Sequence, residues 1–204
     1  NDGKGVQTAN TMLQAMVAAA SVNKPLAAHL EDDTLVHDGV MNEGKASTKL
    51  ELPGITGLAE SSQLARDLVL AKAAGVHYHV AHISTKESVE LVRIAKHEGV
   101  HVTAEVSPHH LLLSEEDINS DNAMFKMNPP LRTQRDREAV IAGLLDGTID
   151  MVATDHAPHG KEEKQKSFRE APFGITGIET SFQLLYTYLV KNGVMTLETL
   201  LERM

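Results

Sequence analysis

The chain has 204 residues, of which 42% are hydrophobic, and a formal net charge of −9. This length is enough to bury a sizeable core and is most simply one domain, while the acidic balance argues against a nucleic-acid surface. The chain has eleven histidines and no cysteine, so disulfides are excluded and any metal must be bound by His, Asp or Glu.

Short apolar runs alternate with longer amphipathic segments along the chain. Helices are predicted over 6–20, 57–75, 85–99, 133–147, 178–193 and 196–204, and strands over 24–32, 76–84, 100–107 and 148–156. Ser84 and Glu87 form an S-x-x-E capping box before the third helix. Alternating strands and helices are typical of a parallel sheet, in a doubly wound fold or a (β/α) barrel. A complete barrel has eight strands in ~250 residues, so we expect a part of one, truncated at both ends.

Chemically active side chains stand where the predicted strands end. His29 lies near the end of the first strand, His82 near the end of the second, and Asp155 at the end of the fourth. Asp2 opens the chain in a glycine-containing turn, where a preceding strand would end. Because the carboxyl ends of parallel strands meet at one edge, we expect these four to converge on a divalent metal, most plausibly zinc. Taken singly, each has an ordinary explanation, as a packed histidine or a turn-capping aspartate.

Other histidines and one charged run have weaker indications. Period-two alternation predicts that His77 and His79 face the surrounding helices. His109 and His110 follow a strand and are expected to be structural, with a role in orienting a ligand as the alternative. The charged run 160–170 has the composition of a solvated loop, and a mobile cover over the site is a further hypothesis.

Several motifs, taken in order, resemble one family. The run ATDHAPHGKEEK matches the second signature of the dihydroorotases at Ala153, Thr154, Asp155, Ala157, Pro158, His159 and Lys164. AHLED, HVAHISTKESV, AEVSPHHLLL, KMNPPLR and APFGITGIET are similar to the bacterial class I enzymes, so the resemblance covers essentially the whole chain. It implies an amidohydrolase (β/α)₈ barrel, of which residues 1–204 would supply strands five to eight as a single-domain C-terminal half. The family's H-x-H pair on the first barrel strand, and the arginine beside it, are not in this sequence.

The resemblance also implies roles for individual residues. His29, His82 and Asp155 look like metal ligands for one or two zinc ions, and Asp2 looks like the carboxylate that bridges or adjoins them. Asp155 would also shuttle the proton when hydroxide attacks the ring carbonyl, since a metal lowers the pKa of bound water towards 7. His159 looks like a contact to the substrate carboxylate and Asn128 a contact to its ring. Residues Phe173 and Gly174 would line the same pocket.

The activity that the resemblance implies is the reversible hydrolysis of (S)-dihydroorotate to N-carbamoyl-L-aspartate in pyrimidine biosynthesis. Hydantoinase or allantoinase activity is the alternative enzyme, although a lysine would then be expected at position 2. A non-catalytic scaffold for a pyrimidine enzyme such as aspartate transcarbamoylase is the alternative outside catalysis. A homodimer, or association with that enzyme, is left open.

The surroundings of the protein are also an expectation from sequence. The N-terminus lacks the features of a secretory signal, and no run approaches the ~20 apolar residues that cross a bilayer. We therefore expect a cytoplasmic protein that binds a small molecule and neither membrane nor nucleic acid. We also expect these 204 residues alone to bind metal poorly and to turn over slowly, because half a barrel leaves two open sheet edges.

Overall fold

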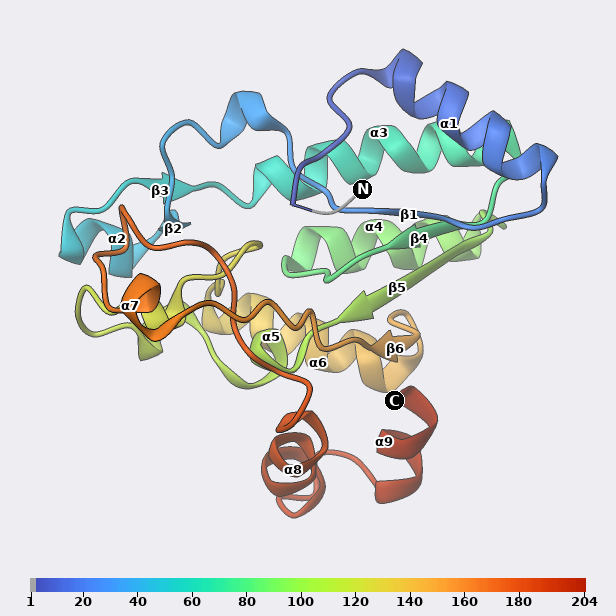
Figure 1. Ribbon diagram of the computed structural model, residues 1–204. Coiled ribbons are helices and arrows are strands. Elements are labelled where there is room, and N and C mark those ends of the chain that lie inside the picture. The colour runs from blue at the N-terminus through green and yellow to red at the C-terminus, as the bar shows by residue number, and fades with distance from the viewer. Residues whose placement is uncertain (1–2) are drawn as a thin grey trace.

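A four-stranded parallel sheet organises the computed structural model, which describes residues 3–204 (Figure 1). Its strands lie side by side in the order β1 (Leu26–Ala28), β4 (Tyr78–Val80), β5 (Val102–Val106) and β6 (Met151–Val152). Leu26 pairs with Tyr78, Tyr78 with Val102, and Glu105 with Met151. All four strands were predicted from the sequence, over longer ranges. Because every pairing is parallel, their carboxyl ends share one edge of the sheet.

Helices pack in a row against one face of this sheet. They are α1 (Ala9–Ser21), α3 (Leu58–Ala74), α4 (Lys86–His97) and α6 (Gln134–Asp146), and each contacts the next. Their buried side chains, among them Met12, Met16 and Leu64, pack with Tyr78 and Val80 of β4 in the main hydrophobic core. The predicted α/β organisation is therefore confirmed, with the core between the sheet and the helices.

Residues 181–203 add shorter helical segments, which lie below β6 in Figure 1. These are α8 (Ser181–Leu185), η4 (Tyr186–Val190) and α9 (Leu197–Arg203), and α9 contacts both β6 and η4. The sequence predicted one helix over 178–193. The structure begins it at Ser181 and continues it from Tyr186 as a π-helix.

A smaller cluster of elements lies at one end of the sheet, the end towards which β5 runs (Figure 1). It contains the two-stranded parallel sheet β2 (Met41–Asn42) and β3 (Gly54–Ile55), with helices α2 (Lys45–Leu50), α5 (Pro108–Leu112) and α7 (Lys161–Lys164). Single turns η1 (Asp33–Leu35), η2 (Glu115–Asp117) and η3 (Ala123–Phe125) connect them. A second core of Val40, Met41, Ala46, Ile118, Leu131 and Phe168 holds this cluster together. None of these elements was predicted from the sequence.

The face of the sheet opposite the helices is polar, which contradicts one prediction. His77 and His79 were expected to face the helices, but Tyr78 and Val80 do so. The Tyr78 hydroxyl donates to Asp67 of α3. Both histidines instead contact Thr103 Oγ1 at 2.8 Å, and His79 Nε2 also lies 3.0 Å from Glu105 Oε2. The prediction failed because the larger apolar core lies between sheet and helices, so the apolar residues of β4 point there.

The start of α4 also differs from the predicted capping box. Thr85, not Ser84, caps the helix, and its hydroxyl accepts the N–H of Ser88. Ser84 donates its hydroxyl and its N–H to the buried carboxylate of Glu60 instead. A buried carboxylate needs such donors, and this tertiary demand shifts the cap by one residue.

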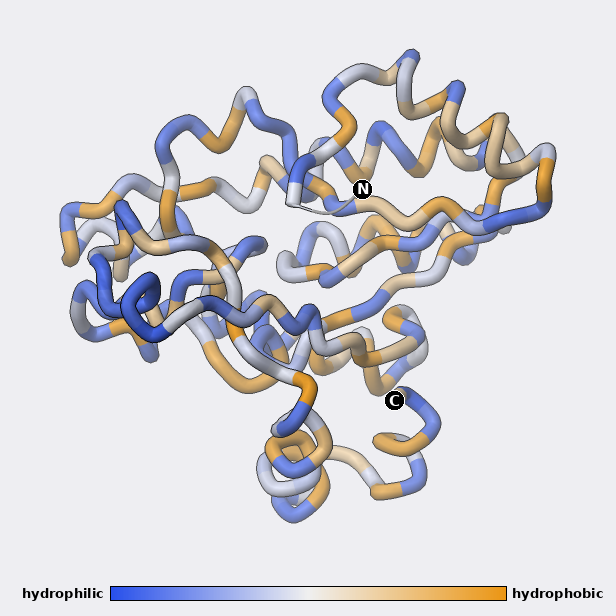
Figure 2. The backbone as a smooth tube through the Cα atoms, viewed as in Figure 1, coloured by the Kyte–Doolittle hydropathy of each residue, from blue (hydrophilic) through white to orange (hydrophobic). Residues whose placement is uncertain are grey.

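Within residues 3–204, no helix is long and apolar enough to cross a membrane. Figure 2 shows polar and apolar segments alternating along the helices, with the chain around α7 among the most hydrophilic.

Candidate metal and substrate site

Two histidines meet at the carboxyl edge of the sheet. His29 follows β1 and His82 follows β4, and these strands are neighbours. His29 Nδ1 lies 3.0 Å from His82 Nε2, and the two rings are edge-to-face with centroids 4.7 Å apart. Both side chains are buried. His82 lies two residues beyond the end of β4 and has a positive φ of 34°. The meeting of these two residues, predicted from strand order, is found.

The donor atoms of this pair fit a metal ion. Zinc–nitrogen bonds of ~2.0–2.1 Å in a tetrahedral shell place two nitrogens about 3.3 Å apart, close to the separation found here. The other ring nitrogen of His29 faces Glu31 Oε1 at 3.8 Å, and a carboxylate behind the imidazole is the usual arrangement for a metal-binding histidine. Burial and the neighbouring His29 imidazole lower the pKa of His82, although Asp155, Glu60 and Glu105 oppose this. A lowered pKa favours the neutral form that binds metals.

The two other predicted metal ligands are Asp2 and Asp155. Asp2 lies outside the described residues, so its role is not tested. Asp155 follows β6 with a φ of 47° and is half-buried, and its negative charge acts on the His82 imidazole. Among residues 3–204, no three or more His, Asp or Glu side chains gather in a way that would hold an ion. The histidine pair is therefore the part of the predicted metal site that the structure brings together.

Asn128 joins this pair through a residue that the sequence did not single out. Asn128 Nδ2 donates to Glu31 Oε2 at 2.8 Å and lies 3.5 Å from His29 Nε2. Burial alone would raise the pKa of Glu31, but the nearby His29 imidazole, the hydrogen bond from Asn128 and the charge of Arg132 outweigh it and hold that pKa below its ordinary value. Glu31 thus connects the histidine pair to a predicted substrate residue. Its position two residues after His29, within AHLED, was the available signal.

The remaining predicted substrate residues form a second group. His159 Nε2 donates to the carbonyl oxygen of Phe173 at 2.7 Å. Gly174 has a φ of 145°, and a Cβ there would lie 2.5 Å from the Ala157 carbonyl oxygen and 2.8 Å from His159 Nε2. Ala157 also donates its N–H to Ile175. The chain around 173–175 is therefore folded tightly onto 157–159, as a shared pocket requires.

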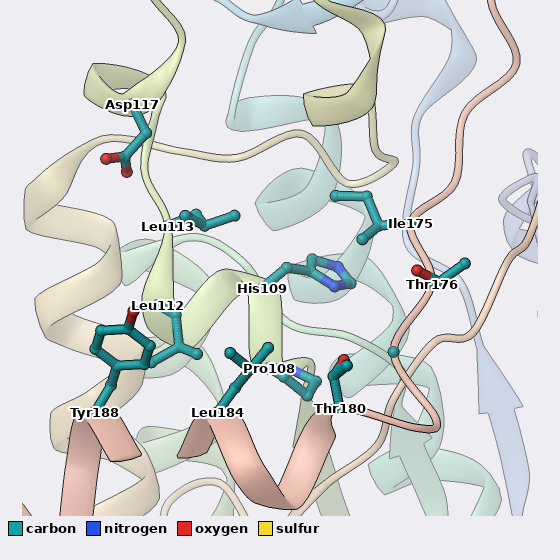
Figure 3. Close-up of a pocket in the computed structure, with 11 residues that line it drawn as sticks. Pro108, His109, Leu112, Leu113, Asp117, Ile175, Thr176, Thr180, Leu184 and Tyr188 are labelled. Carbon is teal, nitrogen blue, oxygen red and sulfur yellow. The ribbon is translucent and has the colours of Figure 1, made fainter. Parts of the chain in front are cut away.

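The two histidines after β5 differ in their surroundings. His110 is buried, contacts Ser107 Oγ at 2.6 Å and donates to the carbonyl oxygen of Pro129 at 2.9 Å, which supports the predicted structural role. His109 lines an apolar cavity of about 400 Å³ between α5 and the segment from Ile175 to Tyr188 (Figure 3). None of the predicted site residues lines this cavity.

Comparison with known proteins agrees with this fold. The chain superposes on the L-hydantoinase of Arthrobacter aurescens with a TM-score of 0.81 and 26% identity, covering 97% of this chain and 45% of that one. The fold is therefore that of part of an amidohydrolase (β/α)₈ barrel, the class of metal-dependent enzymes that hydrolyse cyclic amides.

Sequence comparison identifies the family within that class. Residues 1–88 match the family described as "Dihydro-orotase-like". The dihydroorotase of Lactiplantibacillus plantarum is 62% identical over 204 residues, and that of Staphylococcus aureus is 59% identical over 202. The chain belongs to the dihydroorotase family. It spans about half the length of these curated relatives, 47% and 48% respectively.

Proposed function

We propose that this chain carries half of a dihydroorotase active site and serves the reversible hydrolysis of (S)-dihydroorotate to N-carbamoyl-L-aspartate. The observation that carries the proposal is the close approach of His29 Nδ1 and His82 Nε2 at adjacent strand ends. Identity of 59–62% to named dihydroorotases supports the choice of reaction. In this proposal residues 1–204 are one domain, the C-terminal half of the barrel, and a homodimer or association with aspartate transcarbamoylase remains a prediction.

The residues of the site divide the work of the reaction. His29 and His82 would hold zinc, with Asp155 and Asp2 as the predicted carboxylate ligands. When bound, zinc supplies a Lewis acid that polarises the ring carbonyl and lowers the pKa of water. Asp155 would accept the proton of the attacking water and pass it to the departing ring nitrogen. Glu31 orients His29, since it lies against that ring on the side away from His82.

Asn128 and His159 would position the substrate in this proposal. Asn128 lies beside the histidine pair and would contact the ring of the substrate. His159, with Nε2 engaged by Phe173, keeps Nδ1 as the atom available to a substrate carboxylate. That contact requires the protonated imidazole, because only then is Nδ1 a donor.

Hydantoin hydrolysis is the second candidate, because the solved structures that the chain resembles include hydantoinases. Their identity to this chain is 26%, far below that of the dihydroorotases. We therefore expect dihydroorotate to be preferred over hydantoin and allantoin.

A comparison of variants tests the proposal even if the 204-residue chain turns over slowly. His82→Asn and Asp155→Asn should abolish zinc-dependent dihydroorotate hydrolysis, whereas the exposed His97→Asn should leave it unchanged. Zinc content measured on the same samples should fall in His82→Asn. Hydrolysis that survives both substitutions, or that is faster with hydantoin than with dihydroorotate, would overturn the proposal.

A further inference from the structure

Two lysines are buried beneath the turn that carries Phe173 and Gly174. Lys126 is 3% exposed and Lys164 is 8% exposed. Among the described residues, neither ammonium group has a carboxylate within 4.0 Å, and every hydrogen-bond acceptor of both is a backbone carbonyl. Lys164 belongs to the signature run, yet the sequence assigned it no role.

Four of the five carbonyls belong to residues 168–174, and the fifth belongs to Lys126 itself. Lys126 Nζ donates to the carbonyl oxygens of Phe168 and Ala171. Lys164 Nζ donates to those of Lys126 at 3.1 Å, Pro172 at 3.1 Å and Gly174 at 2.9 Å. Only an ammonium group offers three donors on one atom, so no neutral side chain could make the three contacts of Lys164.

Burial of these charges is unfavourable in itself. Burial lowers the pKa of Lys126, against the opposing charge of Asp121. Burial and the charge of Lys126 together lower the pKa of Lys164 to about 8. A methionine of similar length would avoid this desolvation, so packing alone does not account for a lysine at either position. What a lysine adds here is the set of directed hydrogen bonds.

Those hydrogen bonds join the segments that carry the predicted substrate residues. The carbonyl oxygen of Lys126, two residues before Asn128, accepts from both Lys164 Nζ and the N–H of Gly174. The Lys126 ammonium also lies 4.4 Å from the centre of the Phe173 ring. Phe173 in turn accepts from His159. The lysine pair is thus the point where 126–128, 159–164 and 168–174 are tied together.

We infer that Lys126 and Lys164 are positioning residues, which fix the Phe173–Gly174 turn against Asn128 and His159 in the geometry that binds the substrate. The inference rests on the proposed function for the identity of that substrate, dihydroorotate. It concerns residues that touch neither the histidine pair nor the predicted proton shuttle. Loss of a positioning residue should therefore weaken substrate binding and leave metal binding intact.

The test compares Lys164→Met with Lys161→Met, an exposed lysine on the same short helix. Three quantities are measured: the dissociation constant of dihydroorotate by calorimetry, zinc affinity by chelator competition, and amide hydrogen exchange over residues 168–176. In Lys164→Met we expect at least tenfold weaker dihydroorotate binding, faster exchange over 168–176 and unchanged zinc affinity. Lys161→Met should match the wild type in all three, and Lys164→Arg, which keeps the charge and several donors, should restore part of the affinity.

The outcomes separate the two proposals. If the wild type binds dihydroorotate and Lys164→Met binds it equally well, the positioning inference is wrong and the proposed function stands. If the wild type does not bind dihydroorotate, the proposed function fails, and unchanged hydrogen exchange in Lys164→Met would then also refute the lysine pair as the tie that holds the turn. If Lys164→Met fails to fold, Lys126→Met carries the test, because it removes the hydrogen bonds to Phe168 and Ala171: wild-type affinity with wild-type exchange in that variant contradicts the inference.

Discussion

Replacing His110 should flatten the pH dependence of stability on the acid side. His110 is 3% exposed, and burial lowers its pKa from 6.5 to about 4. Between these two values the unfolded chain binds a proton that the folded chain does not, so the free energy of unfolding falls as the pH drops. At pH 5.0, which is about 1.5 units below the unfolded pKa of 6.5, the accumulated loss in the free energy of unfolding is about 2 kcal/mol, at 1.36 kcal/mol per unit. At pH 7.5 it is close to zero.

Urea unfolding of metal-free protein at pH 7.5 and at pH 5.0 measures this effect. His110→Gln keeps a donor for the Pro129 carbonyl and removes the titrating ring. Burial also lowers the pKa values of His109 and His82, so the wild type should lose more than 2 kcal/mol over this range. The variant should lose about 2 kcal/mol less than the wild type, and His97→Gln, at an exposed position, should behave like the wild type. An equal loss in His110→Gln and wild type would refute the reasoning.

Three further substitutions test other parts of the structure. Gly174→Ala should lower the free energy of unfolding by about 1–3 kcal/mol, because its Cβ would lie 2.5 Å from a carbonyl oxygen at a φ of 145°. The control Gly193→Ala, with open space around it, should lower that free energy by no more than about 1 kcal/mol. Equal losses in the two variants, measured by urea unfolding, would contradict the steric argument. Glu31→Gln should weaken zinc binding about 10–100-fold in a chelator competition, because it lies behind His29, and an unchanged affinity would remove Glu31 from the site. Glu60→Ala should lower the free energy of unfolding by about 3–5 kcal/mol, because it leaves the buried Arg132 guanidinium, 4.0 Å away, without its carboxylate partner. A loss below about 1 kcal/mol would show that this ion pair does not stabilise the fold.

The sequence predicted the sheet and the histidine pair for one physical reason. Parallel strands that follow one another through helices put their carboxyl ends at the same edge, so His29 and His82 meet whatever the details of the loops. The family resemblance then supplied the expected partners of the pair. Asn128 lies close to the pair, and His159, Phe173 and Gly174 lie close to one another, while their roles towards a substrate stay predictions.

Features that depend on tertiary contacts could not be predicted. Ser84 does not cap the helix because its hydroxyl donates to the buried Glu60, which lies 24 residues away in sequence but next to it in space. His79 faces away from the helices because the apolar core lies on the other side of β4, which alternation alone does not decide. The charged run 160–170 has the composition of a solvated loop, and nothing in that composition marks Lys164 as its buried anchor.

The central claim is that a metal ion lies between His29 and His82. The most direct measurement is anomalous diffraction at the zinc edge from crystals of the protein grown with zinc. We expect an anomalous peak about 2.0–2.2 Å from both His29 Nδ1 and His82 Nε2. A crystal that contains zinc at other positions and shows no peak between these two nitrogens would contradict it.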